Sequence, residues 1–308
     1  MTPKGRQLSL INNLKEHEMS DSKKIILFPN AERDIGFEIT RRVMGMLEKR
    51  NKRTAFCPVF EDGDAALARP SGIETAELAE ELPDAEMIIA FGGDGTILYA
   101  ARAAVDAGVP ILGINLGGKG FLAELEEDEI GLIDSVATGE YRLENRMMLD
   151  VEVTRGGSPA YRDFALNDAV VKGINKVVDL MLFGDGQLIS RFSGDGVVIA
   201  TPTGSTAYSW AAGGPIVEEG AHNIIVTPIC AHVLGVKSFV LVSDRRVSVE
   251  LGDRTHNPVY ISVDGGTNVG LLDGDVVKVQ KSGRYTRLVR LSNRSYYKKV
   301  SEKLGERS

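Results

Sequence analysis

An aspartate lies among three glycines at residues 91–96, which read Phe-Gly-Gly-Asp-Gly-Thr. The apolar run 87–91 is typical of a buried parallel strand, and the apolar spacing over 96–107 predicts a helix. A glycine-rich turn between a strand and a helix N-terminus presents backbone N–H groups to phosphate, and glycine lets a ligand approach the backbone closely. The residues expected to line such a phosphate site are Gly92, Gly93, Gly95 and Thr96.

The aspartate of this turn, Asp94, is unexpected in a site that only holds phosphate, because its negative charge repels phosphate. A carboxylate is useful there if it takes a proton from a hydroxyl group as a phosphoryl group arrives, which is kinase chemistry. The alternative is a tight turn in which Asp94 only caps the following helix. The hexapeptide alone leaves both interpretations open, because short glycine motifs also occur by chance.

A second polar cluster follows a predicted strand at 196–200: residues 201–208 read Thr-Pro-Thr-Gly-Ser-Thr-Ala-Tyr. Its hydroxyl groups can bond an amide or a base edge, its tyrosine offers a flat ring, and Gly204 and Ala207 leave space beside them. This combination suits a nucleoside, although a helix start capped by serine or threonine is the alternative. The residues expected to bind the nucleoside are Thr203, Ser205, Thr206, Ala207 and Tyr208.

The elements that position these motifs change in kind near residue 140. Before it, strands and helices alternate, which predicts a parallel sheet with helices on both faces. The predicted strands are 24–28, 54–59, 86–91 and 109–115, and the predicted helices are 35–49, 76–81 and 96–107. Both glycine turns, 92–95 and 116–120, follow the carboxyl ends of strands, where ligands bind in such sheets.

From residue 141, short β-branched runs separated by turn signals predict a mostly antiparallel β domain. The runs are 149–153, 177–182, 196–200, 247–251, 259–263 and 276–279. We therefore expect an α/β domain at 24–140 and a β-rich dinucleotide-binding domain at 141–286. Residues 1–23 are polar and are expected to form a mobile leader. The last segment, 287–308, predicts a strand and an amphipathic helix from residue 296 to 304.

Composition excludes several classes of protein. The chain has 308 residues, enough for two domains, and its net charge of −7 argues against nucleic acid as a partner. It has no apolar stretch of 18 residues, so no membrane span is predicted. Cys57 and Cys230 are too few for a disulfide scaffold and fit a reducing cytoplasm. His232 lies close to Cys230 but has no second Cys/His pair nearby, so no metal site is expected.

Taken together, the motifs resemble those of the NAD kinase family, from about residue 24 to the end of the chain. The matching segments are 92–96, 115–117 with 120–122, 167–168, 194–196, 201–208 and 264–265. Lipid kinases and phosphofructokinase share the first motif, whereas the octapeptide 201–208 discriminates the family from them.

The resemblance implies the two domains described above, with residues 287–308 packing on the N-terminal domain. It also implies transfer of the γ-phosphoryl group of ATP to the 2′-hydroxyl of the adenosine ribose of NAD. Mg²⁺ would accompany ATP, and the protein would be a homo-oligomer, a dimer or tetramer. Asp94 would be the general base, and Asn167 and Asp168 would hold ribose hydroxyls. The further binding residues that the resemblance implies are Asn115, Gly117, Phe121 and Asp195.

Two other functions are weighed against this one. A diacylglycerol- or sphingosine-type lipid kinase would need an apolar channel, which the hydroxyl cluster 203–208 argues against. A non-catalytic dinucleotide sensor would not need the charge of Asp94. The chain also departs from the family pattern: it has Asp168 where the family usually has glutamate. The other departures are at Tyr99, Ser193, Lys237 and Gly266.

Overall fold

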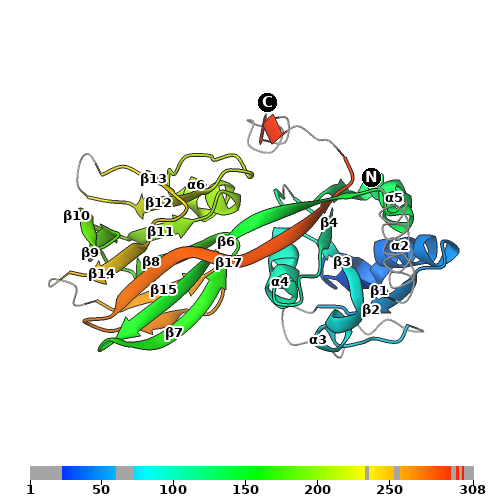
Figure 1. Ribbon diagram of the computed structural model, residues 1–308, viewed down its shortest axis with the longest axis horizontal. Coiled ribbons are helices and arrows are strands. Elements are labelled where there is room, and N and C mark those ends of the chain that lie inside the picture. The colour runs from blue at the N-terminus through cyan, green and yellow to red at the C-terminus, as the bar shows by residue number, and fades with distance from the viewer. Residues whose placement is uncertain are drawn as a thin grey trace, which may run out of the picture. The chain divides into compact units, whose positions relative to one another are not determined.

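The computed structural model describes residues 23–59, 73–118, 120–232, 236–252, 257–292, 296–297 and 300–301 (Figure 1). Its internal contacts divide the chain into two units, residues 1–145 with 287–308 and residues 146–286. The boundaries predicted from the sequence are residues 140 and 286. Apart from Lys23, the predicted leader lies outside the described residues. None of the helices in the described part of the chain is long and apolar enough to cross a membrane.

The first unit contains a parallel sheet whose strands lie in the order β4, β3, β1, β2. Their bounds are β1 Lys24–Pro29, β2 Arg53–Phe56, β3 Ala85–Gly92 and β4 Ile111–Asn115. The short strand β5, Leu125–Glu126, pairs with β4 in parallel, as does Leu288 near the end of β17, Val276–Arg290. The predicted parallel α/β domain is confirmed.

Helices cover both faces of this sheet. Those of the first unit are α2 Glu38–Lys49, α3 Leu78–Glu81, α4 Asp94–Ala104 and α5 Ile133–Thr138, with 3-10 turns η1 Ile35–Phe37, η2 Leu82–Asp84 and η3 Glu127–Leu132. Helices α2 and α5 pack on the face that includes Leu27 and Ile89, while Ile97 of α4 packs against Gly113 on the other face. The helix predicted to begin at residue 35 begins at 38, because Gly36 and Phe37 have positive φ angles.

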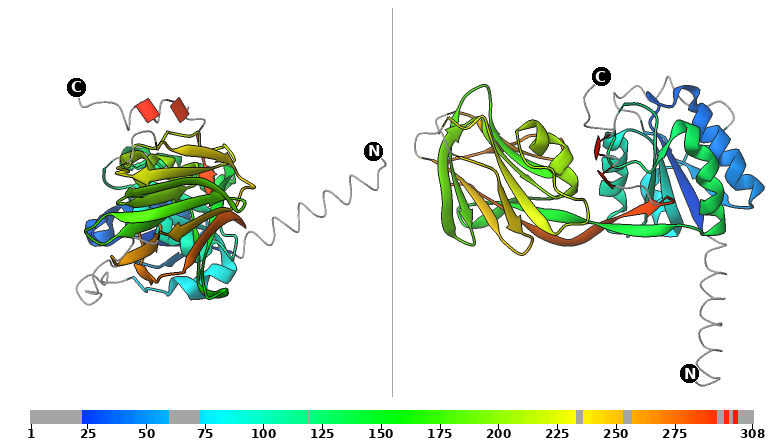
Figure 2. Two further views of the ribbon diagram at one scale, coloured as in Figure 1. Left: turned by 90° about the vertical axis from the view of Figure 1, so that its left-hand side faces the viewer. Right: turned by 90° about the horizontal axis from the view of Figure 1, so that it is seen from above.

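The second unit is built from two layers of antiparallel strands (Figure 2). One layer consists of β6 Arg142–Arg155, β7 Ser158–Ala165, β9 Val178–Gly184, β10 Gln187–Gly194, β14 Val247–Leu251 and β17. The other has the order β13, β12, β11, β8, β15, β16. Its strands are β8 Asp168–Gly173, β11 Gly196–Ala200, β12 Asn223–Ile229, β13 Phe239–Val242, β15 Val259–Val263 and β16 Val269–Leu271.

Side chains from both layers form one apolar core, to which β6 contributes Leu149 and β11 contributes Ile199. The predicted β-rich domain is therefore confirmed. Two strands are longer than the sequence indicated. Strand β6 extends the expected run 149–153 to residues 142–155. The expected strand 276–279 and the strand expected at the start of 287–308 are one strand, β17, because polar residues from 280 to 287 continue it without an apolar pattern. Most of the predicted helix 296–304 lies outside the described residues.

Candidate active site

In the first unit, Asp94 is the first residue of α4, and its carboxylate turns toward the second glycine turn. The N-cap of α4 is Gly93, so the alternative in which Asp94 caps the helix is wrong. The carboxylate instead accepts hydrogen bonds from the backbone N–H groups of Phe121, at 2.8 Å, and Leu122, at 3.0 Å. Asp94 is half-buried. Its two carboxylate oxygens are thereby oriented, and each keeps a lone pair for a further partner.

The glycines around Asp94 divide into two kinds. A Cβ atom at Gly92 would lie 2.3 Å from Thr96 Oγ1, and one at Gly120 would lie 2.6 Å from Asp94 Oδ1, so both positions require glycine for packing. At Gly93 and Gly95 an added Cβ would meet no atom within 4 Å. These two glycines leave the backbone open, as a phosphate site requires.

The turn that follows β4 is closed by Asn115. Its amide Nδ2 donates to Gly118 O at 2.9 Å and to Glu126 Oε2 at 2.6 Å. A Cβ atom at Gly117 would lie 3.4 Å from Arg33 Nη1, so a guanidinium stands beside this turn. Sequence reasoning missed Arg33, although it follows the carboxyl end of β1. Its charge suits an anionic ligand at this edge of the sheet.

In the second unit, Asp264 organises the predicted ribose-binding pair. Its Oδ2 accepts a hydrogen bond from the backbone N–H of Leu166 at 2.7 Å, and its Oδ1 accepts from Asn167 at 2.7 Å and from Asp168 at 3.0 Å. Asp264 itself adopts a positive φ angle of 49°. One carboxylate therefore fixes the backbone of three successive residues.

Asp168, beside this carboxylate, is only 5% exposed. Burial, and to a lesser extent the negative charge of Asp264, raise the pKa of its carboxyl group to about 7. Asp168 is therefore partly protonated at neutral pH, which distinguishes it from an ordinary surface carboxylate.

The hydroxyl cluster is largely engaged within the fold. It forms η4, Thr203–Thr206, followed by α6, Tyr208–Ala211. Ser205 is fully buried; its hydroxyl donates to Pro202 O at 2.7 Å and accepts from the backbone N–H of Val217 at 3.0 Å. The backbone N–H of Gly204 donates to Thr201 Oγ1 at 3.0 Å, and the N-cap position of η4 is Pro202, so neither a serine nor a threonine occupies it.

The expectation that Gly204 leaves space for a ligand is wrong. A Cβ atom at this position would lie 2.2 Å from Asn167 O. The glycine instead lets η4 pack directly on the backbone of Asn167. Two segments singled out in the sequence, 167–168 and 203–206, are therefore adjacent within the second unit.

Tyr208 and Asp195 come together with a residue that sequence reasoning missed, Lys172 of β8. Lys172 Nζ donates to the phenol oxygen of Tyr208 at 3.3 Å. This bond is the main cause of the raised pKa of Lys172, to which the charge of Asp195 also contributes. Lys172 lies four residues after Asp168 on the same strand, so the two side chains are on the same face of the sheet. This spacing could have identified Lys172 from the sequence.

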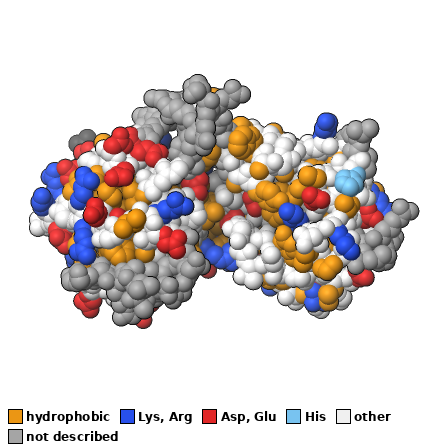
Figure 3. All heavy atoms as spheres, turned by 180° about the vertical axis from the view of Figure 1, so that it is seen from behind, with side chains coloured by type: hydrophobic (Ala, Val, Ile, Leu, Met, Phe, Trp, Pro, Cys, Tyr) orange, Lys and Arg blue, Asp and Glu red, His pale blue; other side chains and the backbone are white. Residues whose placement is uncertain are grey.

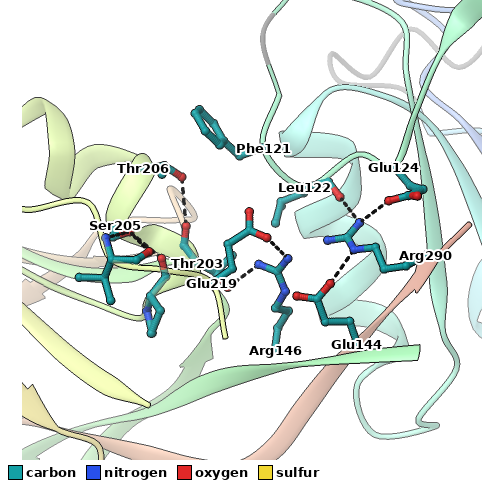
Figure 4. Close-up of polar contacts among 12 residues, drawn as sticks. Phe121, Leu122, Glu124, Glu144, Arg146, Thr203, Ser205, Thr206, Glu219 and Arg290 are labelled. Carbon is teal, nitrogen blue, oxygen red and sulfur yellow. Dashed lines mark hydrogen bonds and ion pairs between the residues drawn. The ribbon is translucent and has the colours of Figure 1, made fainter. Parts of the chain in front are cut away.

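Two buried arginines near the long strands were also missed (Figure 4). Arg146 of β6 is fully buried; it forms an ion pair with Glu219 and donates to Thr203 Oγ1 at 3.3 Å. Arg290 of β17 pairs with Glu124 and Glu144 in the first unit. The described residues contain no group of three or more side chains that could hold a metal ion.

A parallel sheet that carries an oriented carboxylate at a glycine turn, joined to a β-rich unit, defines a class of two-domain phosphotransferases that act on hydroxyl groups. Comparison with known sequences makes this specific. The family profile of the ATP-NAD kinase N-terminal domain matches residues 29–141, and that of the ATP-NAD kinase C-terminal domain matches residues 167–291. The chain belongs to the ATP-NAD kinase family.

Curated relatives agree over most of their length. The chain is 38% identical over 285 residues to the NAD kinase of Natranaerobius thermophilus, covering 92% of this chain and 98% of that one. It is 39% identical over 290 residues to the NAD kinase of Moorella thermoacetica, covering 92% and 90%.

Solved structures show the same fold. An NAD kinase from Archaeoglobus fulgidus in complex with ATP matches with a TM-score of 0.65 and 26% identity over 90% of this chain and 98% of that one. A yeast NADH kinase complexed with NADH matches with a TM-score of 0.79 over 93% and 89%, at 24% identity.

Proposed function

We propose that this protein is an NAD kinase, which transfers the γ-phosphoryl group of ATP to the 2′-hydroxyl of the adenosine ribose of NAD and releases NADP and ADP. The observation that carries the proposal is the carboxylate of Asp94, oriented by two backbone N–H groups at the glycine turn of a family member. Binding alone would not require a charge at this point of a phosphate-binding turn.

Asp94 acts as the general base in this proposal. The ribose hydroxyl oxygen bonds to the γ-phosphorus as the bond from that phosphorus to the bridging oxygen of ADP breaks, and the hydroxyl proton passes to the Asp94 carboxylate. Because the Phe121 and Leu122 N–H groups fix the carboxylate, the proton acceptor is in place before the reaction. The open backbone at Gly93 and Gly95 is available to the phosphates.

Mg²⁺ enters with ATP as part of the substrate. Mg²⁺ usually keeps waters and substrate phosphates as ligands, so the phosphates of ATP would hold it. Its charge offsets that of the donor phosphates.

The second unit supplies the NAD site. The Asn167–Asp168 pair, held by Asp264, is proposed to bond ribose hydroxyls. Lys172, Tyr208 and Asp195 form a second polar group that suits the rest of a dinucleotide.

We also propose a homo-oligomer in the cytoplasm. Strand β13 is an edge of its sheet, and it exposes Val240 and Val242 by 48% and 52%, which a second copy would cover. Hydrophobic side chains also gather on the face drawn in Figure 3. The free thiols of Cys57 and Cys230 support a reducing compartment. Light scattering of the purified protein measures the subunit number, and a monomer would contradict the first of these proposals.

The test is incubation with NAD, ATP and Mg²⁺, with an enzymatic assay for NADP, and a parallel reaction with diacylglycerol in micelles. We expect NADP and no phosphorylated lipid. Lipid phosphorylation without NADP would support the lipid kinase instead. NAD binding by calorimetry without any turnover would support a sensor.

A further inference from the structure

Arg290 is almost completely buried in the first unit, where the chain returns along β17 (Figure 4). Its Nε donates to Glu144 Oε2 at 2.7 Å. Its Nη1 donates to the carbonyl oxygen of Leu122 at 3.3 Å and to Glu124 Oε2 at 3.4 Å. A buried guanidinium is costly unless carboxylates compensate it, and two carboxylates do so here. Part of its hydrogen bonding is nevertheless directed at a backbone carbonyl.

Glu124, the partner of Arg290, is 5% exposed and holds the chain end in place. Its Oε1 accepts hydrogen bonds from the backbone N–H groups of Leu291, at 3.0 Å, and Ser292, at 2.9 Å. The backbone N–H of Glu124 donates to Gly113 O of β4 at 3.0 Å. The segment that contains Leu122 and Glu124 is therefore fixed to the central sheet on one side and to the returning chain on the other.

Leu122 connects this ion pair to the proposed base. Its carbonyl oxygen accepts from Arg290, and its N–H donates to Asp94 Oδ1 at 3.0 Å. Gly120, two residues before Leu122, lets the Asp94 carboxylate lie directly against this turn, because a Cβ atom there would lie 2.6 Å from Asp94 Oδ1. A displacement of Leu122 would therefore move the carboxylate.

We propose that Arg290, with Glu124, is a positioning residue for Asp94 that acts through the backbone of Phe121 and Leu122. The inference rests on the proposed function, in which Asp94 accepts the hydroxyl proton. It gives the pair a role in turnover rather than in substrate affinity. Arginine suits this role because its planar fork reaches two carboxylates and a carbonyl at once, whereas lysine offers a single nitrogen.

The first experiment compares Glu124→Gln with Glu86→Gln. Glu86 is the matched control: it pairs with Lys52 at 3.0 Å, its side chain is 12% exposed, and it lies in the same unit. We expect Glu124→Gln to lower kcat for NAD about 10- to 100-fold, as small misplacements of catalytic groups do, with KM for NAD changed less than about twofold. Glu86→Gln should leave kcat within about twofold of wild type. Equal effects of the two substitutions would overturn the proposal.

A double-mutant cycle separates positioning from general destabilisation. If Glu124 acts through Asp94, adding Glu124→Gln to Asp94→Asn should lower kcat little further. Multiplicative losses would overturn the proposal. Arg290→Lys should retain more activity than Arg290→Met, and the reverse order would contradict it.

Amide hydrogen exchange tests the same pair without using activity. Exchange at the Phe121 and Leu122 amides should be faster by about tenfold or more in Glu124→Gln than in wild type, and unchanged in Glu86→Gln. Unchanged exchange in Glu124→Gln would overturn the positioning role even if NAD is phosphorylated. If wild type makes no NADP, the proposed function fails, and exchange alone then decides whether the pair fixes these amides.

Discussion

Each unit contains a carboxylate that accepts backbone N–H groups from a neighbouring segment. Asp94 holds two, those of Phe121 and Leu122, and Asp264 holds three, those of residues 166–168. They differ in their neighbours. Both have glycines next to them in sequence, but Asp264 also lies beside a second carboxyl group, Asp168, which is buried and has its pKa raised to about 7. In the first unit these backbone hydrogen bonds orient the proposed base, whereas in the second unit they hold the backbone of a segment that contains a buried carboxyl group, Asp168.

The largest effect is expected at Asp94. Asp94→Asn should lower kcat for NAD by roughly 10²–10⁴-fold, because the proton acceptor is lost. NAD affinity should be nearly unchanged, since the predicted ribose contacts are in the second unit. Steady-state kinetics and calorimetric titration measure the two quantities. Turnover near that of wild type would remove Asp94 from the mechanism.

Because the pKa of Asp168 is raised in the folded protein, we predict an unusual pH dependence of the free energy of unfolding. Between about pH 4 and pH 7 the unfolded chain ionises at this residue while the folded chain keeps the proton. The free energy of unfolding therefore falls as pH rises, by up to about 4 kcal/mol from this group, and levels off above pH 7. Urea unfolding of wild type and Asp168→Asn across this pH range measures the contribution of Asp168 to the free energy of unfolding.

A control with the opposite sign is available for that measurement. A hydrogen bond from Arg155 lowers the pKa of Asp275, so its contribution to stability is present above the ordinary pKa and is lost as pH falls. The free energy of unfolding of wild type minus that of Asp275→Asn should therefore rise with pH. Curves of the same sign for Asp168→Asn and Asp275→Asn would show that the burial of Asp168 is not the cause.

Two glycine substitutions sharpen the comparison between the units. Gly120→Ala would press on the Asp94 carboxylate, so kcat should fall about 10- to 100-fold with a smaller loss of stability. Gly204→Ala would press on the Asn167 backbone, which cannot yield as a side chain can, so thermal stability should fall more. Kinetics and thermal melts of both variants test this. A larger loss of thermal stability for Gly120→Ala than for Gly204→Ala would contradict this expectation.

The smallest effect is expected for the ribose contact. Asp168→Ala should raise the Kd for NAD about tenfold, which corresponds to the loss of hydrogen bonds to a carboxylate, while kcat changes much less. Calorimetric titration of NAD measures this. Unchanged affinity would mean that Asp168 is only a structural residue of the segment held by Asp264.

The fold class was predictable because strong local patterns carry it. The apolar runs that form β1, β3 and β4, and the glycine turns that follow β3 and β4, are continuous in sequence. β17 was not recognised as one strand, because residues 280–287 are polar and pairing with neighbouring strands, rather than local preference, decides their conformation.

The partners of the site residues were not predictable in the same way. The N–H groups that hold Asp94 come from residues 27 and 28 positions later, and Arg290 lies 168 positions after Leu122. No periodicity relates such residues. Gly204 was misread for the same reason, since the Asn167 backbone that it contacts is distant in sequence. The predicted binding residues themselves stay predictions.

The return of the chain to the first unit has a consequence for biosynthesis. Residues 146–286 are contiguous, so the second unit has all its residues as soon as position 286 leaves the ribosome. The first unit begins synthesis earlier but lacks Arg290 until nearly the whole chain has been translated. A chain that ends before that residue has no guanidinium for the Leu122 carbonyl and for Glu124. Products truncated between residues 286 and 290 are therefore expected to fold their second unit and yet lack the complete surroundings of Asp94.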